Sequence, residues 1–270
     1  MDNYPAPGPC GPHKILTLAL LAAPLLATLS SCRVIQPSKT EVVVLGMIHG
    51  SHRTSETYGL EELERILRAA EPDMVLTEIP PDRLAEAAEQ FARTGEITES
   101  RVRVFPEYTD VLFPLQAELG FEIVACAGWT REMANARRAK LAELRKTQPA
   151  QSAQADEGWD WINRKHRQEG FDDDPIKMHT GDRYDEIVEI GIIPYDVHFN
   201  DALGLGGWTN INDAHWAPCA DALTRVKGQG KRVVITFGAW HKARLRAALQ
   251  ARKDCVEVDA GKLVSRALAQ

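Results

Sequence analysis

Two histidines occupy matching positions in a short repeated pattern. The segments Gly46-Met47-Ile48-His49 and Gly238-Ala239-Trp240-His241 each place a histidine shortly after a glycine, and Glu78 ends a separate apolar run. Two imidazoles and one carboxylate match the protein ligands of a hydrolytic divalent-metal site, which leaves a position open for a water whose pKa the metal lowers. Without a metal, a histidine polarised by Glu78 could act as a general base. His49, Glu78 and His241 are therefore candidates both for metal ligands and for catalytic groups.

The segments before these residues predict buried parallel strands. Residues 41–45, 73–79 and 232–237 are mostly apolar and show no period-two alternation, which is typical of strands that helices cover on both faces. A further strand is expected over 121–126. Ligands of such sheets bind beyond the carboxyl ends of the strands. We expect an α/β fold with a mainly parallel central sheet flanked by helices, and the candidate residues at one edge of it.

Glu78 has an alternative role. A carboxylate at the end of an apolar strand costs free energy if it is ionised and unpaired, so it needs a cation, a metal, a histidine or solvent. Glu78 could simply pair with Arg83 or cap a helix. His52, three residues after His49, could join the ligands if that turn is helical, because this spacing puts side chains on one face.

The helices and the domain organisation follow from spacing and composition. Apolar residues recur at helical spacing over 60–70, and a second helix is expected over 84–93. We interpret residues 130–191 as a helical cap inserted over the pocket, within one domain that spans 32–270. Inside this cap, residues 146–157 are rich in Gln, Ala and Ser and predict a surface loop. A helix over 213–226 is expected to follow a cap residue, Thr209 or Asn210.

Further polar residues lie near these segments. Glu107 stands among apolar and aromatic neighbours and is a second candidate acid, or else a helix-start carboxylate bound to backbone amides. The segment after the cap is dense in polar groups, and either His198 or His215 could act as a ligand. The candidates for substrate binding are Arg53, Arg83, Glu107, Asn210 and Asn212.

The motifs resemble a known group of proteins. With two Gly-x-x-His patterns and the glutamate between them, residues 42–258 are similar to the TraB/ChaN/Tiki-type superfamily, which includes the erythromycin esterases. The resemblance implies an α/β fold in which His49, Glu78 and His241 face one pocket. The superfamily usually carries an arginine shortly before the second motif, whereas residues 206–213 contain none. Another residue, such as Arg53 or Arg83, would have to bind the anion that this arginine holds, or the anion is not bound at all.

The resemblance implies several activities. Members resemble metal-dependent proteases or metal-free esterases, and one bacterial branch is a haem-binding lipoprotein. We expect a hydrolase of the cell envelope, working with or without a divalent metal ion, that cleaves a peptide or ester bond in a peptide or small-molecule substrate. The alternative is a lipoprotein that binds haem or a metal without catalysis, helped by Tyr195 or His215. A third hypothesis is an inactive signalling inhibitor that binds a peptide in the same pocket.

The amino-terminal segment predicts where in the cell the protein is located. Residues 15–29 form an apolar stretch after Lys14, of signal-peptide length and shorter than the roughly 20 residues of a membrane-spanning helix. The sequence Leu29-Ser30-Ser31-Cys32 resembles the bacterial lipobox, in which the cysteine is lipidated after cleavage. Residues 1–31 are then a lipoprotein signal peptide, and Cys32 anchors the protein to a membrane, facing the periplasm or the exterior. Cleavage without lipidation is the alternative.

Charge and cysteine usage exclude other classes. The formal net charge is −6 and no basic stripe occurs, which argues against a nucleic-acid partner. Cys126 is expected to fill the core. A disulfide between Cys219 and Cys255 is possible in an oxidising compartment, but the spacing does not support it.

Overall fold

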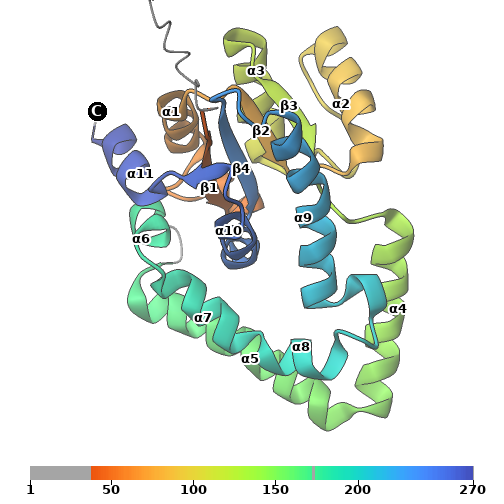
Figure 1. The fold of residues 1–270 in the computed structure, drawn as a ribbon. Coiled ribbons are helices and arrows are strands. Elements are labelled where there is room, and N and C mark those ends of the chain that lie inside the picture. Colours follow the sequence, from red (N-terminus) through yellow and green to blue (C-terminus); the bar gives the residue numbers. More distant parts are fainter. Residues whose placement is uncertain (1–37, 172–173, 270) are drawn as a thin grey trace, which may run out of the picture. The chain divides into compact units, whose positions relative to one another are not determined.

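A central parallel sheet organises the molecule (Figure 1). The computed structural model describes residues 38–171 and 174–269, and its sheet has five strands in the order β3-β2-β4-β1-β5, paired in parallel throughout. Helices flank the sheet, which confirms the predicted α/β class. The strands are β1 (Thr40–Met47), β2 (Met74–Thr77), β3 (Glu122–Ala125), β4 (Arg232–Gly238) and β5 (Cys255–Glu257).

Both faces of the sheet are covered. Successive side chains of a strand point to opposite faces, and in β1 Val43 packs in one core cluster while Val44 packs in another. The first cluster includes apolar side chains of α1 (Leu60–Ala70) and α11 (Ala260–Leu268). The second includes those of α9 (Trp208–Arg225) and α10 (Lys242–Gln250). Burial on both sides explains why the strands read as continuous apolar runs.

The strand order brings the two glycine motifs together. β4 lies between β1 and β2, with Met47 opposite Gly238 and Thr77 opposite Thr236. β1 and β4 therefore end at the same level of the sheet, and β2 ends two residues earlier in the register. The candidate residues follow directly, because η1 (His49–Arg53) follows β1, Glu78 follows β2, and η4 (Ala239–His241) follows β4.

The remaining short elements complete this edge of the sheet. α2 (Pro81–Thr94) begins shortly after Glu78, and a π-helical turn, η2 (Glu107–Leu112), runs into α3 (Phe113–Leu119) before β3. On the other side, η3 (Gly204–Gly206) precedes α9, whose N-cap is Gly207. The helix thus begins earlier than the predicted residue 213, and the prediction that Thr209 or Asn210 caps it was wrong.

Helices occupy the space beyond the carboxyl ends of the strands (Figure 1). They are α4 (Arg131–Thr147), α5 (Pro149–Glu169), α6 (Pro175–His179), α7 (Arg183–Gly191) and α8 (Ile193–Phe199). The surface loop predicted over 146–157 was wrong, because α5 starts at Pro149 and continues through this stretch. Proline suits the first position of a helix, and alanine and glutamine are good helix formers, so the composition fits a helix as well as a linker.

The structure bears on the predictions for the cysteines, whereas those for the amino terminus lie outside the described residues. The predicted signal peptide, 1–31, and the lipidation site Cys32 lie outside the described residues. In the described part of the chain, no helix is long and apolar enough to span a membrane. Cys126, Cys219 and Cys255 are buried free thiols, so Cys219 and Cys255 form no disulfide in this structure.

Candidate metal centre and the adjacent histidine

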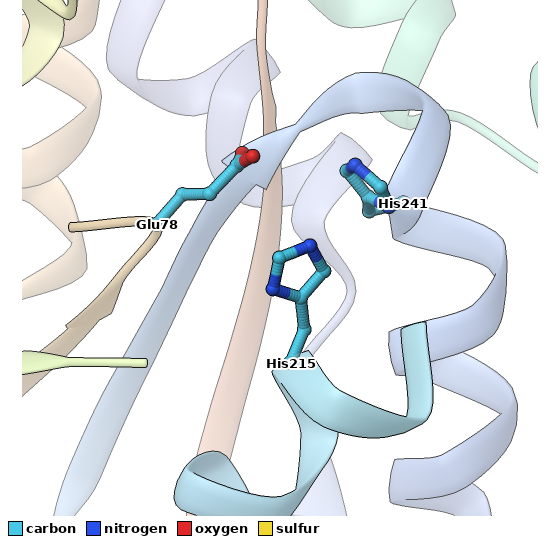
Figure 2. A group of neighbouring side chains, drawn as sticks. All are labelled: Glu78, His215 and His241. Atoms are coloured by element: carbon cyan, nitrogen blue, oxygen red, sulfur yellow. The ribbon is translucent and has the colours of Figure 1, made fainter. Parts of the chain in front are cut away.

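Three side chains from separate elements converge beyond the sheet (Figure 2). Glu78 extends from the end of β2, His215 from α9, and His241 from the turn after β4. One ligand atom from each lies within 4.8 Å of the other two, and this group could hold a metal ion. Glu78 and His241 were predicted as ligands from the sequence. His215 stands where the sequence had suggested His49.

Asn212 fixes the ring of His241. The amide nitrogen of Asn212 donates to the carbonyl oxygen of Trp208 at 2.8 Å, so its Oδ1 faces His241 Nδ1, also at 2.8 Å. Nδ1 must then carry the proton, and Nε2 keeps a lone pair for a ligand. The indole of Trp208 stacks on the imidazole, with ring centres 5.0 Å apart. Asn212, which the sequence suggested for substrate binding, thus orients a histidine that could bind a metal.

His215 carries its proton on the opposite nitrogen. The backbone N–H of Gly128 donates to His215 Nδ1 at 2.8 Å. Burial lowers the pKa of His215 to about 4, so the ring is neutral at physiological pH and its proton sits on Nε2. Nε2 is buried and has no hydrogen-bond partner among the described residues. With its proton in place, Nε2 can donate a hydrogen bond, and it could bind a metal only if the proton moved to Nδ1 and the Gly128 hydrogen bond were lost.

Glu78 is held firmly at the centre of the site. Its Oε2 accepts a hydrogen bond from Gly238 N at 2.9 Å. Its backbone N–H donates to the hydroxyl of Tyr108, and that hydroxyl donates to Thr236 O at 2.7 Å. The side chain is therefore anchored to β4 and the backbone to η2.

The electrostatics of the site favour a cation. Burial raises the pKa of Glu78, although His49 and Gly238 oppose the shift. Burial, together with the nearby His215 and His49, holds the pKa of His241 well below its usual range. His215 and His241 are consequently neutral, and the neutral imidazole is the form that binds metals. A divalent cation would supply the positive charge that buried Glu78 lacks.

His49 lies beside this group and is paired with a buried acid. Its Nδ1 is 2.6 Å from Oε1 of Glu107, and its Nε2 is 3.8 Å from Oε2 of Glu78. Burial opposes protonation of His49, but the hydrogen bond and charge of Glu107, with the charge of Glu78, raise its pKa. The His49 side chain is 35% exposed, whereas that of Glu107 is 1% exposed. Glu107 therefore orients a histidine that solvent can still reach.

The glycine of each motif makes room for the other motif. A β-carbon on Gly238 would lie 2.6 Å from Nε2 of His49, and one on Gly46 would lie 2.8 Å from Cβ of Ala239. Only glycine permits both approaches without displacement. His49 itself has a φ of 50°, a left-handed backbone conformation that is costly for a side-chain-bearing residue and is concentrated at functional sites.

Two other histidines have different roles. Both ring nitrogens of His52 are used, since Nδ1 lies 2.8 Å from Tyr58 O and Nε2 accepts from Ile48 N. His52 thus closes the turn after β1 and is not available as an extra ligand. His198, on α8, lies with Nε2 2.8 Å from the side-chain oxygen of Gln154.

The remaining predicted residues are engaged elsewhere. Arg53 pairs with Asp110 at 2.9 Å, and Arg83 pairs with its neighbour Asp82 at 3.0 Å. The alternative in which Glu78 pairs with Arg83 is therefore wrong. Asn210 donates its side-chain amide to Gly204 O at 2.7 Å, which ties η3 to the start of α9.

From the sequence, His215 was only one of three possible extra histidine ligands, with His52 and His198. A clearer signal was available, because Asn212 and His215 are three residues apart and share one face of a helix. Glu107 begins the π-helical turn, so its proximity to His49 depends on tertiary packing. Comparisons with protein-family models, curated proteins and solved structures found no match for this chain.

Proposed function

We propose that this chain is a hydrolase that cleaves a peptide or ester bond with the help of a divalent metal ion. The observation that carries the proposal is the pair His49 and Glu107, oriented at 2.6 Å and placed beside a group of residues able to hold a metal. A solvent-accessible histidine supported by a buried carboxylate is the usual arrangement of a general acid–base catalyst.

The metal would be held mainly by Glu78 and His241. Both present lone pairs, and Asn212 orients His241 from behind. When bound, a divalent ion would polarise a carbonyl oxygen and lower the pKa of water. Carboxylate and imidazole donors from separate elements, with ligand atoms within 4.8 Å of one another, suit a single divalent ion, and haem is the alternative.

The protein's own groups would carry the proton and the developing charge. His49 would exchange protons through Nε2, because Glu107 holds Nδ1 and stabilises the charged ring. His215 would donate its Nε2–H to an oxygen that becomes negative during attack, and its burial makes that hydrogen bond stronger. This role agrees with the hydrogen bond from Gly128 N to Nδ1, which leaves the ring proton of His215 on Nε2.

The resemblance to the TraB/ChaN/Tiki-type superfamily and the lipid anchor at Cys32 belong to the same proposal. The approach of His49, Glu78 and His241 to one another supports the resemblance. The anchor rests on the lipobox-like sequence, and we propose a bacterial cell-envelope location on that basis.

The proposal can be tested with the full chain purified without chelators. Elemental analysis should find a divalent metal, and a panel of nitrophenyl esters and peptides should reveal turnover that chelation abolishes. His49→Ala should lose turnover and keep metal, whereas His241→Ala should lose both. His198→Ala is the matched control and should behave as the wild type. A folded His49→Ala/His241→Ala double variant with undiminished hydrolysis would refute the proposal.

A further inference from the structure

A cavity lies among the helices beyond the sheet, apart from the candidate metal centre. Its volume is about 210 Å³, and α4, α5 and α8 form its walls. The residues that line it are Arg137, Leu141, Arg145, Ser152, Ala155, Asp156, Trp159, Tyr195 and Phe199. None of them belongs to the site described above.

Arg137 carries a positive charge that no carboxylate neutralises. Its Nε and Nη2 donate to the hydroxyl of Tyr195 at 3.1 and 2.8 Å, and Nε also donates to Gly206 O. In the part of the chain that the structure describes, Nη1 has no hydrogen-bond partner and the guanidinium forms no ion pair. The guanidinium lies over the rings of Trp129 and Tyr195, 5.8 and 5.7 Å from their centres, and these uncharged partners leave its positive charge available to an anion from outside.

Ser152 adds an unused polar group. The residue is 7% exposed, and its hydroxyl has no hydrogen-bond partner within the described residues. A buried hydroxyl without a partner costs free energy that a ligand oxygen could recover. The other charged residues of the lining, Arg145 and Asp156, pair with each other at 3.4 Å. The lining therefore has a surplus of one positive charge, from Arg137.

The rest of the lining is apolar. Trp159 and Phe199 contribute aromatic surface, and Leu141 and Ala155 contribute aliphatic surface. The cavity is smaller than the roughly 300 to 1,000 Å³ of pockets that enclose drug-sized molecules. It suits a small molecule with one negative charge and an apolar body.

We propose that this cavity binds a small monocarboxylate with an apolar or aromatic body. Arg137 would hold the carboxylate through Nη1, and the aromatic side chains would cover the body. A phosphate fits less well, because it carries between one and two negative charges at neutral pH and prefers several donors, whereas the surplus here is a single charge. The inference does not depend on the proposed hydrolase activity.

The cavity is linked to the candidate metal centre indirectly, through two contacts. Trp159 meets Trp240 of the second glycine motif, with ring centres 5.2 Å apart. Arg137 donates a hydrogen bond to the backbone oxygen of Gly206. Gly206 lies two residues before Trp208, and Trp208 stacks on His241. The carboxylate could therefore come from a free acid or from the acidic end of a substrate.

The test uses benzoate with the full chain after metal has been removed by chelation and dialysis. Calorimetric titration should show saturable binding of one benzoate per chain below about 10 mM, and benzyl alcohol, which lacks the charge, should not bind. Arg137→Gln should weaken binding by about tenfold or more, since it removes a charged hydrogen bond. The matched control is Arg138→Gln, which changes an exposed neighbour on α4 and should leave the affinity unchanged.

A second variant covers the case in which Arg137→Gln does not fold. Ala155→Leu fills the cavity and keeps the guanidinium, and it should also abolish binding while circular dichroism stays native. Absence of saturable benzoate binding to the wild type would overturn the proposal, as would binding that is retained in either folded variant. Binding seen only after metal is restored would place the carboxylate at the metal centre and overturn it too.

The two sources of the carboxylate can be separated afterwards. If the acid is part of a substrate, hydrolysis of carboxylate-bearing esters should show a raised KM in Arg137→Gln, and neutral esters should be unaffected. If the acid is a free ligand, both classes of ester should be hydrolysed alike. Either result supports the cavity as a carboxylate site, and failure of hydrolysis altogether leaves the benzoate titration as an independent test.

Discussion

His49 and Gly238 lie in direct contact across the ends of two neighbouring strands. A β-carbon at residue 238 would be 2.6 Å from Nε2 of His49 and 3.4 Å from Oε2 of Glu78. The second glycine motif thus provides the surface against which the histidine of the first motif rests. This relationship gives the glycine a role in placing His49, beyond its role in the turn.

Gly238→Ala should consequently impair catalysis more than folding. The φ of residue 238 is −45°, which alanine accepts, so the damage comes from displacing His49. We expect kcat/KM to fall by about a hundredfold, because displacing a catalytic group by about an ångström is enough for such a loss. The free energy of unfolding should fall by about 1 kcal/mol, as is typical of single substitutions, so the thermal midpoint should fall by only a few degrees.

The control for this prediction is Gly50→Ala. Gly50 follows His49 directly, and a β-carbon there would meet nothing within 4 Å. This variant should keep wild-type kcat/KM. Equal losses in the two variants would show that the backbone near His49 matters and that the contact with Gly238 does not.

Glu107→Gln should lower the pKa of His49. Burial lowers this pKa, and Glu107 is the main group that raises it, so without the charge only Glu78 opposes burial. NMR titration of the metal-free protein should show the imidazole of His49 titrating at lower pH than in the wild type. Glu89→Gln, at an exposed position of α2, should leave the titration unchanged.

The same substitution should alter stability in a pH-dependent way. A histidine whose pKa is raised by folding contributes stability that is fully present below its unfolded pKa, about 6.5, and is lost as pH rises through the folded pKa. The loss of unfolding free energy in Glu107→Gln should therefore be larger near pH 6 than near pH 9. Denaturant unfolding at the two pH values measures it, and an equal loss at both would contradict the assigned charge pairing.

Part of this site could be predicted from the sequence. Continuous apolar runs followed by His49, Glu78 and His241 predict strand ends at one edge, because parallel strands share their direction. The order β2-β4-β1, which makes those ends neighbours, depends on packing between distant segments and left no local signal. His215 and Glu107 arrive from helices that tertiary contacts place, so their sequence neighbourhoods could not identify their partners.

His215→Ala and His241→Ala should separate metal binding from catalysis. His241 offers a free Nε2, whereas the proton on His215 Nε2 makes that residue a donor. We expect His215→Ala to retain stoichiometric metal and to lose about a hundredfold or more in kcat, the usual effect of removing one oxyanion donor. His241→Ala should bind no metal. Loss of metal in both variants would show that His215 is a third ligand that sheds its proton.

Asn212→Ala tests whether the orientation of His241 matters. The amide fixes the His241 tautomer through Oδ1 and is itself fixed by Trp208 O. Without it, Nδ1 loses its acceptor, and the ring can rotate or carry its proton on Nε2, which blocks the lone pair. Removal of such a supporting hydrogen bond weakens metal affinity about 10- to 100-fold in comparable sites. Competition with a chromogenic chelator measures this change, and Asn163→Ala, at an exposed position of α5, is the control. An Asn212→Ala affinity equal to that of the control would mean that packing against Trp208 alone orients His241.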